Sequence, residues 1–254
     1  MFSIAGSGWI IPNLESVIFD KDGTIVDVHL YWGEIIRRRS LAAIAHYRLP
    51  PDSFPRLCGS MGLSLADNRL LPQGPVGLTS RDEVIQALCH CLDGLGVVNS
   101  GEAVGDLFTQ VHEAFLPDID RYLQLIPGVF ECISAMRQAG AKLAVVTSDT
   151  AVNTCETLKK LGLSSCFDVI MGRDMTPEPK ISGVPARKAL KMMGQSAERT
   201  VCLGDAPMDF LMAEKSGCRA GIGVATGQTP IAELSRHTAY TVLSMQDLIV
   251  ERVL

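Results

Sequence analysis

Two aspartates, Asp20 and Asp22, flank a single lysine at the end of the short apolar run SVIFD. In an extended segment alternate residues share a face, and a turn at Gly23 can bring both carboxylates toward one ligand. Two such carboxylates can divide the work of a phosphoryl transfer between them. One can attack phosphorus and form an aspartyl-phosphate. The other can protonate the leaving oxygen and later deprotonate the attacking water.

Further acids follow a later apolar run, TVCLGD, and complete a set of candidate metal residues: Asp20, Asp22, Asp205 and Asp209. Converging carboxylates repel one another unless a cation binds among them or their pKa values rise. Hard oxygen ligands select Mg²⁺, which keeps several waters and takes only one or two carboxylates directly. We therefore expect a magnesium cofactor with Asp20 and Asp205 as the best direct ligands. Asp209 would bind through a water or hold the surrounding groups in place.

Polar groups that suit phosphoryl oxygens come from two other segments. Thr147 and Ser148 end the run AVVTS, and Lys180 lies between a later strand and its helix. Thr147 offers a hydroxyl donor and Lys180 a positive charge, and main-chain amides after Asp20 could complete the cradle. We expect Thr147, Ser148 and Lys180 to bind the phosphate of a small phosphorylated substrate.

The elements that must position these residues alternate between strands and helices. Strands are predicted over 16–20, 142–147, 167–171, 200–204 and 219–224, and helices over 151–161, 185–193, 207–216 and within IPGVFECISAMRQAG. This alternation predicts an α/β fold, a Rossmann-like parallel sheet with helices on both faces and right-handed crossovers. Ligands bind beyond the carboxyl ends of such strands, which is where all the candidate residues lie.

A block of helical periodicity interrupts this pattern after the first strand. Apolar residues recur at helical spacing over 31–47, 81–95 and 102–115, with Pro- and Gly-rich segments between them. We therefore expect an α/β core formed by 1–27 and 125–254, and an inserted all-α domain over 28–124. The segment before the first strand is expected to be a short leader onto it.

Composition limits the classes of function. The chain has 254 residues, 47% of them hydrophobic, and a net charge of −5, which does not favour nucleic acid as a partner. No apolar run approaches the length of a membrane span, so a membrane location is not expected. The eight cysteines are scattered, as expected for free buried thiols in a reducing cytoplasm.

Taken together, these segments resemble the haloacid dehalogenase superfamily. Its nucleophile motif DxDGT corresponds to 20–24, its second motif to AVVTSD with Thr147, and its fourth motif GDxxxD to 204–209. The segment that leads into the second motif resembles the phosphoglycolate phosphatase-like branch. The resemblance implies that Asp20 is the covalent nucleophile and Asp22 the general acid and base. It also implies that 28–124 form the helical C1 cap of that branch.

The third motif of that family, Lys-Pro-x-Pro before a helix, has two possible matches in TPEPKISGVPARKAL. One alignment matches TPEP and puts Thr176 at the lysine position. The other uses Lys180, with Pro185 at the start of the helix. We prefer the second alignment because it supplies the cation that a phosphoryl group requires.

The function expected from these features is magnesium-dependent hydrolysis of a small phosphorylated metabolite, of the phosphoglycolate or sugar phosphate type, through an aspartyl-phosphate. One alternative is a phosphoryl transferase that resembles phosphoglucomutases, although those enzymes often carry Val where this chain has Thr24. The other is a member of the superfamily that binds a ligand without catalysis.

Overall fold

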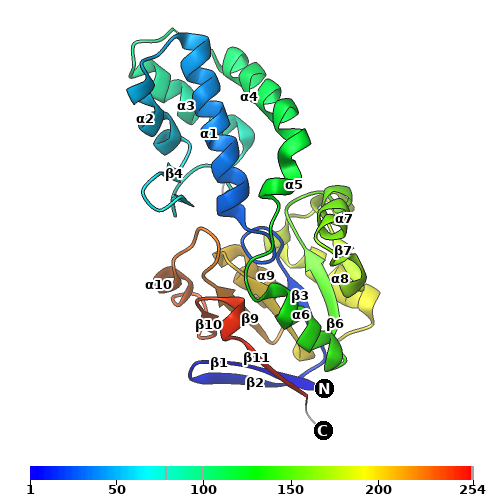
Figure 1. The fold of residues 1–254 in the computed structure, drawn as a ribbon. Helices are drawn as coiled ribbons and strands as arrows, with labels where there is room; N and C mark the ends of the chain where they lie inside the picture. Colours follow the sequence, from blue (N-terminus) through cyan, green and yellow to red (C-terminus); the bar gives the residue numbers. More distant parts are fainter. Residues whose placement is uncertain (78, 99, 253–254) are drawn as a thin grey trace. The chain divides into compact units, whose positions relative to one another are not determined.

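The computed structural model describes residues 1–77, 79–98 and 100–252. The chain divides into two compact units (Figure 1). One consists of Met1–Asp27 and Leu125–Leu254, and the other of Val28–Gln124.

The first unit is built on a six-stranded sheet in the order β10-β9-β8-β3-β6-β7, in which every pairing is parallel. Its strands are β3 (Ser16–Phe19), β6 (Lys142–Val146), β7 (Val169–Met171), β8 (Thr200–Gly204), β9 (Ala220–Val224) and β10 (Thr241–Val242). All residues of β3 and β8 are buried, as expected for central strands covered on both faces. The predicted parallel α/β sheet is confirmed.

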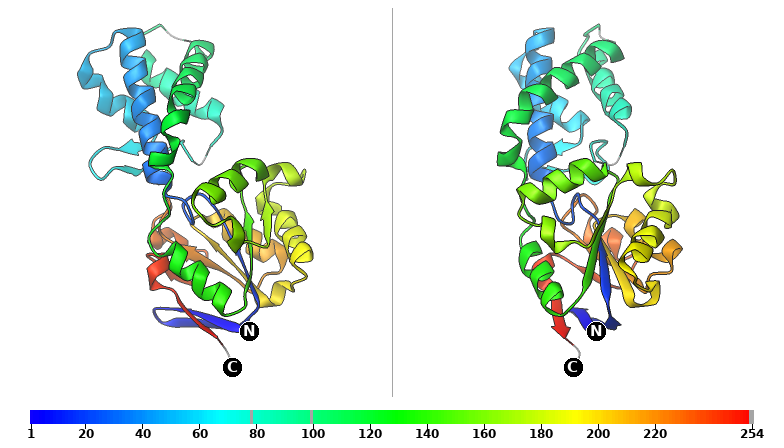
Figure 2. Two further views of the ribbon diagram at one scale, coloured as in Figure 1. Left: turned by 45° about the vertical axis from the view of Figure 1, so that its right-hand side comes forward. Right: turned by 90° about the vertical axis from the view of Figure 1, so that its right-hand side faces the viewer.

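Helices connect successive strands and cover the two faces of the sheet (Figure 2). They are α6 (Val129–Gln138), α7 (Ala151–Lys160), α8 (Val184–Met193) and α9 (Pro207–Ser216), with the short α10 (Ile231–Leu234) after β9. Right-handed crossovers put α6 and α7 on one face and α8 and α9 on the other. On the α8 and α9 side, Leu190 and Met212 pack in one apolar cluster with Ile18 and Ala144 of the sheet.

The register of the central strands brings their carboxyl ends to one level. Phe19 lies opposite Val145 of β6 and Leu203 of β8, and the amide of Asp20 continues the ladder by donating to Leu203 O at 2.8 Å. The residues that follow β3, β6 and β8 therefore meet at the same edge of the sheet.

The N-terminal segment is not the leader expected from the sequence. It forms a hairpin of β1 (Phe2–Gly6) and β2 (Trp9–Leu14), and β11 (Ile249–Arg252) pairs antiparallel with β1 to complete a three-stranded sheet. Phe2, Ile4 and Leu14 are fully buried. The strand that completes this sheet, β11, lies far from β1 in the chain, so no local pattern indicates the pairing.

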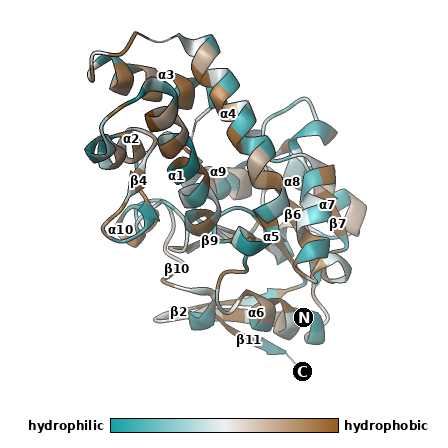
Figure 3. Cartoon of the chain, turned by 45° about the horizontal axis from the view of Figure 1, so that its top comes forward, coloured by the Kyte–Doolittle hydropathy of each residue, from teal (hydrophilic) through white to brown (hydrophobic). Residues whose placement is uncertain are grey.

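The second unit contains α1 (Val28–Tyr47), α2 (Phe54–Ser60), α3 (Arg81–Asp93), α4 (Gly101–Phe115) and α5 (Ile119–Tyr122). Helix α4 buries Val104, Leu107, Phe108 and Val111 on one side, and its hydrophobic residues follow that helical spacing (Figure 3). Among the described helices, none combines the length and the apolar character that crossing a bilayer requires.

The expectation of an all-helical second unit needs one correction. A short antiparallel ladder, β4 (Leu63–Ser64) with β5 (Arg69–Leu70), lies between α2 and α3. Asn68 adopts a left-handed backbone with φ of 57° in the connecting turn. Strands of two residues are too short to show an alternating pattern in the sequence.

Replacing Phe2 by alanine tests whether the N-terminal hairpin is part of the folded core. Phe2 is 1% exposed, so Phe2→Ala should lower the free energy of unfolding by about 3 kcal/mol. Ile10 of the same hairpin is 58% exposed, and Ile10→Ala should cost less than about 1 kcal/mol. Denaturant unfolding of both variants measures the difference. Equal effects would mean that the hairpin does not pack as described.

Candidate active site

Asp20 lies directly beyond β3, at the centre of the sheet edge. Its side chain is buried, and Lys180 Nζ donates a hydrogen bond of 2.5 Å to Asp20 Oδ1. Lys180 belongs to a 3₁₀ turn over Lys180–Ser182, just before α8. The fold thus brings an acid that follows β3 and a lysine from a loop 160 residues later to one point.

A tight turn follows Asp20 and explains the glycine of DGT. The amides of Ile25 and Val26 both donate to Lys21 O, and Gly23 N donates to Val26 O at 2.9 Å. Gly23 has φ of 87°, a conformation that favours glycine. A Cβ atom on Gly23 would collide with the carboxylate of Asp205. The glycine therefore lets the turn approach the acid that follows β8.

Three buried carboxylates meet at this edge: Asp20, Asp205 and Asp209 each offer an oxygen within 4.8 Å of the others. Asp205 follows β8, and Asp209 stands in the first turn of α9, where its Oδ2 accepts a hydrogen bond of 3.0 Å from Ala206 N. A Cβ atom on Gly204 would clash with Asp209, and one on Gly227 with Asp205. Glycines therefore make the space in which these acids converge.

Burial and mutual repulsion shape the charges of this cluster. Loss of solvation, together with the charges of Asp20 and Asp209, raises the pKa of Asp205 well above its ordinary value. Burial also raises the pKa of Asp209 to about 6, although Lys180 opposes the rise. Burial alone would lower the pKa of Lys180, but the charges of Asp20 and Asp209 outweigh it, and the net shift is upward. Lys180 is therefore held as an ammonium between Asp20 and Asp209, 2.6 Å from Asp209 Oδ1.

The donor set fits a divalent cation. Three carboxylates face one buried ammonium, so the cluster carries excess negative charge that a bound cation would neutralise. All the donors are hard oxygens, which suits Mg²⁺ better than a soft metal. Asp22 lies outside this group, and a metal-binding role for it stays a prediction.

Asp22 pairs with its neighbour in the chain and with no other described side chain. Lys21 Nζ lies 2.9 Å from Asp22 Oδ1 and 3.1 Å from Asp149 Oδ2. Loss of solvation raises the pKa of Asp22, and Lys21 opposes this rise. Because 43% of the Asp22 side chain is exposed, water moderates the effect. No role was predicted for Lys21 or Asp149, whose only signal in the sequence is their position inside two of the motifs.

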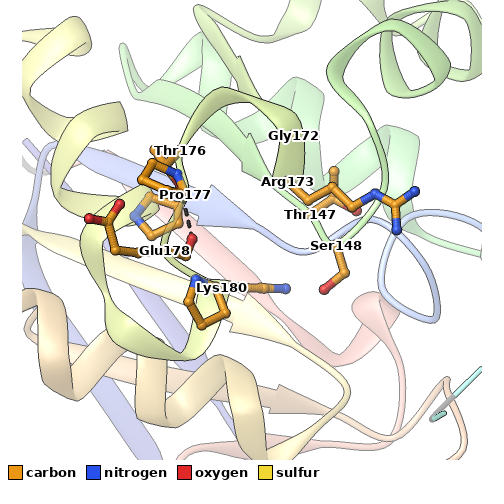
Figure 4. A pocket seen from close by; sticks show the side chains of 10 residues that line it. Thr147, Ser148, Gly172, Arg173, Thr176, Pro177, Glu178 and Lys180 are labelled. Carbon is orange, nitrogen blue, oxygen red and sulfur yellow. Dashed lines mark hydrogen bonds between the residues drawn. The ribbon is translucent and has the colours of Figure 1, made fainter. Parts of the chain in front are cut away.

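Thr147 and Ser148 lie where β6 ends. Thr147 is buried, and its hydroxyl oxygen accepts a hydrogen bond of 3.1 Å from Asp149 N. Ser148 is exposed. Both residues line a cavity of about 330 Å³ together with Lys180, and Figure 4 shows Ser148 and the Lys180 amine on facing sides of it. The three predicted phosphate-binding residues thus border one space.

Thr176 lines the outer part of the same cavity but does not reach the acids. Its hydroxyl donates to Glu178 O at 2.9 Å (Figure 4). Of the two positions considered for the third motif, the structure brings Lys180 to Asp20 and leaves Thr176 on the loop. Lys180 is buried, whereas the residues between it and Thr176, which are Pro177, Glu178 and Pro179, are exposed.

Known proteins share both the sequence pattern and the fold. A family model of haloacid dehalogenase-like hydrolases matches residues 14–217, from the last residue of β2 to just beyond α9. The probable phosphatase IndB of Dickeya dadantii is 30% identical over 213 residues, 83% of this chain and 81% of that protein. The phosphoglycolate phosphatase of Caulobacter vibrioides is 27% identical, with 85% of this chain and 81% of that protein covered. The match to the phosphoglycolate phosphatase of Neisseria meningitidis, 34% identical over 107 residues, covers 45% of that relative.

Solved structures agree on the fold. A predicted phosphoglycolate phosphatase from Haemophilus somnus has a TM-score of 0.70 at 20% identity, covering 93% of this chain and 97% of that chain. A HAD-superfamily hydrolase from Geobacter sulfurreducens has a TM-score of 0.64 at 17% identity, covering 92% and 94%. At these identities the likeness concerns the fold alone.

The cluster predicts a pH-dependent response to magnesium. Because the folded-state pKa of Asp209 is raised to about 6 from 3.8, the metal-free protein should lose stability as pH rises through that window. Mg²⁺ binds deprotonated carboxylates, so its stabilising effect should grow over the same window. At saturation we expect a rise in Tm of about 5 to 10 °C near pH 8 and much less near pH 5.

Thermal unfolding with and without Mg²⁺ checks this prediction. Asp205→Asn should abolish the response, whereas Asp174→Asn, which alters an acid outside the cluster, should retain it. A response that is independent of pH, or that survives in Asp205→Asn, would contradict a metal site at Asp20, Asp205 and Asp209.

Proposed function

The chain belongs to the haloacid dehalogenase-like hydrolase family, and we propose that it is a phosphatase that hydrolyses small phosphorylated metabolites. The observation that carries this proposal is the buried Asp20 carboxylate, which is held by Lys180 and joined by Asp205 and Asp209. Relatives named as phosphatases support it. Phosphoglycolate and sugar phosphates are the proposed substrate classes.

In the first step Asp20 acts as the nucleophile. Lys180 occupies Oδ1 of Asp20, which leaves Oδ2 without a partner among the described residues and able to attack. A bond forms between that oxygen and phosphorus, while the ester bond to the leaving oxygen breaks. The departing oxygen keeps the electron pair of the ester bond and takes a proton from Asp22. The products are an aspartyl-phosphate and a free alcohol.

In the second step water hydrolyses the aspartyl-phosphate. Asp22, now ionised, accepts a proton from water as the water oxygen attacks phosphorus. The bond between phosphorus and Asp20 breaks and returns the carboxylate, and inorganic phosphate leaves. Asp22 ends the cycle protonated, so the enzyme is restored and one water molecule is consumed.

The other site residues bind and orient the phosphoryl group. The Lys180 ammonium and the hydroxyls of Thr147 and Ser148 border the space in which that group would lie. Asp20, Asp205 and Asp209 would hold Mg²⁺, which when bound supplies positive charge to the phosphoryl oxygens.

We further propose that the second unit, Val28–Gln124, is a cap domain that selects the substrate. Caps of this kind exclude water from a reacting centre and contact the part of the substrate that is not transferred. Its substrate-contacting residues would differ between members that act on different metabolites.

Removing the nucleophile should abolish turnover. Asp20→Asn keeps the shape of the side chain but not its negative charge, and should reduce release of phosphate from an aryl phosphate by at least about 1000-fold. The parent protein should also lose activity in EDTA and regain it with Mg²⁺. Turnover that survives in Asp20→Asn would overturn the proposed mechanism. A bisphosphorylated sugar that is isomerised without release of phosphate would favour a mutase instead.

The two positions considered for the third motif can be separated by alanine substitutions. Lys180→Ala removes the cation beside Asp20 and should lower kcat/KM about 100-fold or more. Thr176→Ala removes only a hydrogen bond within the loop and should leave kcat/KM near the parent value. The reverse order would assign the role to Thr176. Circular dichroism of both variants controls for folding.

A further inference from the structure

The Lys21 side chain is buried between two acids from different segments. It is 6% exposed, with Nζ 2.9 Å from Asp22 Oδ1 and 3.1 Å from Asp149 Oδ2. Removing an ammonium from water is costly unless it is paired and hydrogen-bonded. Asp22 and Asp149 both supply a carboxylate to the Lys21 ammonium, so its burial is compensated by two ion pairs.

Asp149 is itself held firmly at the start of α7. Its Oδ1 accepts a hydrogen bond of 2.7 Å from Thr150 N and one of 3.1 Å from Asn153 Nδ2. Its other oxygen faces Lys21. Asp149 therefore connects Lys21 to a helix that packs against the sheet, and can serve as an anchor.

Asp22 lacks such support of its own. Its side chain is 43% exposed, and among the described residues Lys21 alone forms an ion pair or a hydrogen bond with its carboxylate. An aspartate at the mouth of a site has several rotamers open to it. The ammonium of Lys21 selects the one in which Asp22 Oδ1 lies 2.9 Å from Lys21 Nζ.

We propose that Lys21 is a positioning residue that holds the carboxyl group of Asp22 where it exchanges protons with the leaving oxygen, with Asp149 as the fixed anchor. This inference rests on the proposed function. Without Lys21, the like charges of Asp22 and Asp149 would repel across a short gap, and Asp22 would turn toward solvent. The role differs from that of Lys180, which contacts Asp20.

Substrates that differ in their need for a proton separate positioning from general damage to the site. A nitrophenolate leaves without protonation, whereas an alkoxide does not. The value of kcat/KM reports the steps up to release of the leaving group, which include this proton transfer. In Lys21→Met, kcat/KM should fall about 100-fold for an alkyl phosphate and less than about fivefold for p-nitrophenyl phosphate.

Three further variants sharpen the comparison. Asp149→Asn keeps Lys21 and Asp22 but removes the charge of the anchor. It should lower the ratio of kcat/KM for the alkyl phosphate to kcat/KM for p-nitrophenyl phosphate, by a smaller factor than Lys21→Met does. Lys21→Arg keeps the charge and should recover part of the loss on the alkyl phosphate. Lys159→Met removes an exposed lysine of α7 and should leave kcat/KM unchanged for both substrates.

Two kinetic outcomes would overturn the proposal. If Lys21→Met lowers kcat/KM equally for both substrates, Lys21 serves the phosphoryl group or the packing of the loop. If neither value changes, the pair with Asp22 has no role in turnover. Circular dichroism and Tm of each variant identify any loss of folding.

A crystal structure of Lys21→Met tests the same idea without any activity. We expect the Asp22 carboxylate to leave the position described here, and an unmoved carboxylate would overturn the proposal. If the parent protein released no phosphate from either substrate, the proposed function would fail. The structure of Lys21→Met would still decide whether Lys21 holds Asp22.

Discussion

The convergence of buried carboxylates on one ammonium is the constraint on which the rest of this structure depends. Asp20, Asp205 and Asp209 lie within reach of one another, and Lys180 stands between two of them. Such a cluster costs free energy unless its charges are balanced. One ammonium does not balance three acids, which makes the site suitable for a divalent cation. Burial is the main cause of the raised pKa values of Asp205 and Asp209, and repulsion from neighbouring carboxylates adds to it.

The backbone meets this constraint in two ways. Parallel pairing of β3 with its neighbours on both sides brings the ends of three strands to one level, so acids that are far apart in the chain become adjacent. Glycines at 23, 204 and 227 then leave room for carboxylates where a Cβ atom would clash. The turn after β3 and the first turn of α9 are shaped by the acids they accommodate. The same arrangement serves the chemistry proposed here, because the nucleophile must stay charged and still be accessible.

The two acids near β3 are supported differently, in accordance with their proposed roles. Asp20 is buried and bound by Lys180, whereas Asp22 is partly exposed and bound by Lys21. A nucleophile benefits from a fixed position and constant charge. A group that gives and takes a proton must reach the leaving oxygen and then water, and a single ion pair at the edge of the site allows that. The family model assigns the chain to the haloacid dehalogenase-like hydrolases, and solved structures share its fold.

Local sequence patterns were sufficient to predict the family, the parallel sheet and the set of residues that could take part in chemistry. Asp20 and Asp22 follow an apolar run, and two later apolar strands, β6 and β8, are followed by Thr147 and Asp205. Which of these groups contact one another became clear from the three-dimensional arrangement. It joined β11 to β1 from opposite ends of the chain, brought Lys180 rather than Thr176 to Asp20, and paired Lys21 with an acid beyond β6. Such contacts depend on sheet register and on the course of loops, which residue spacing along the chain does not encode.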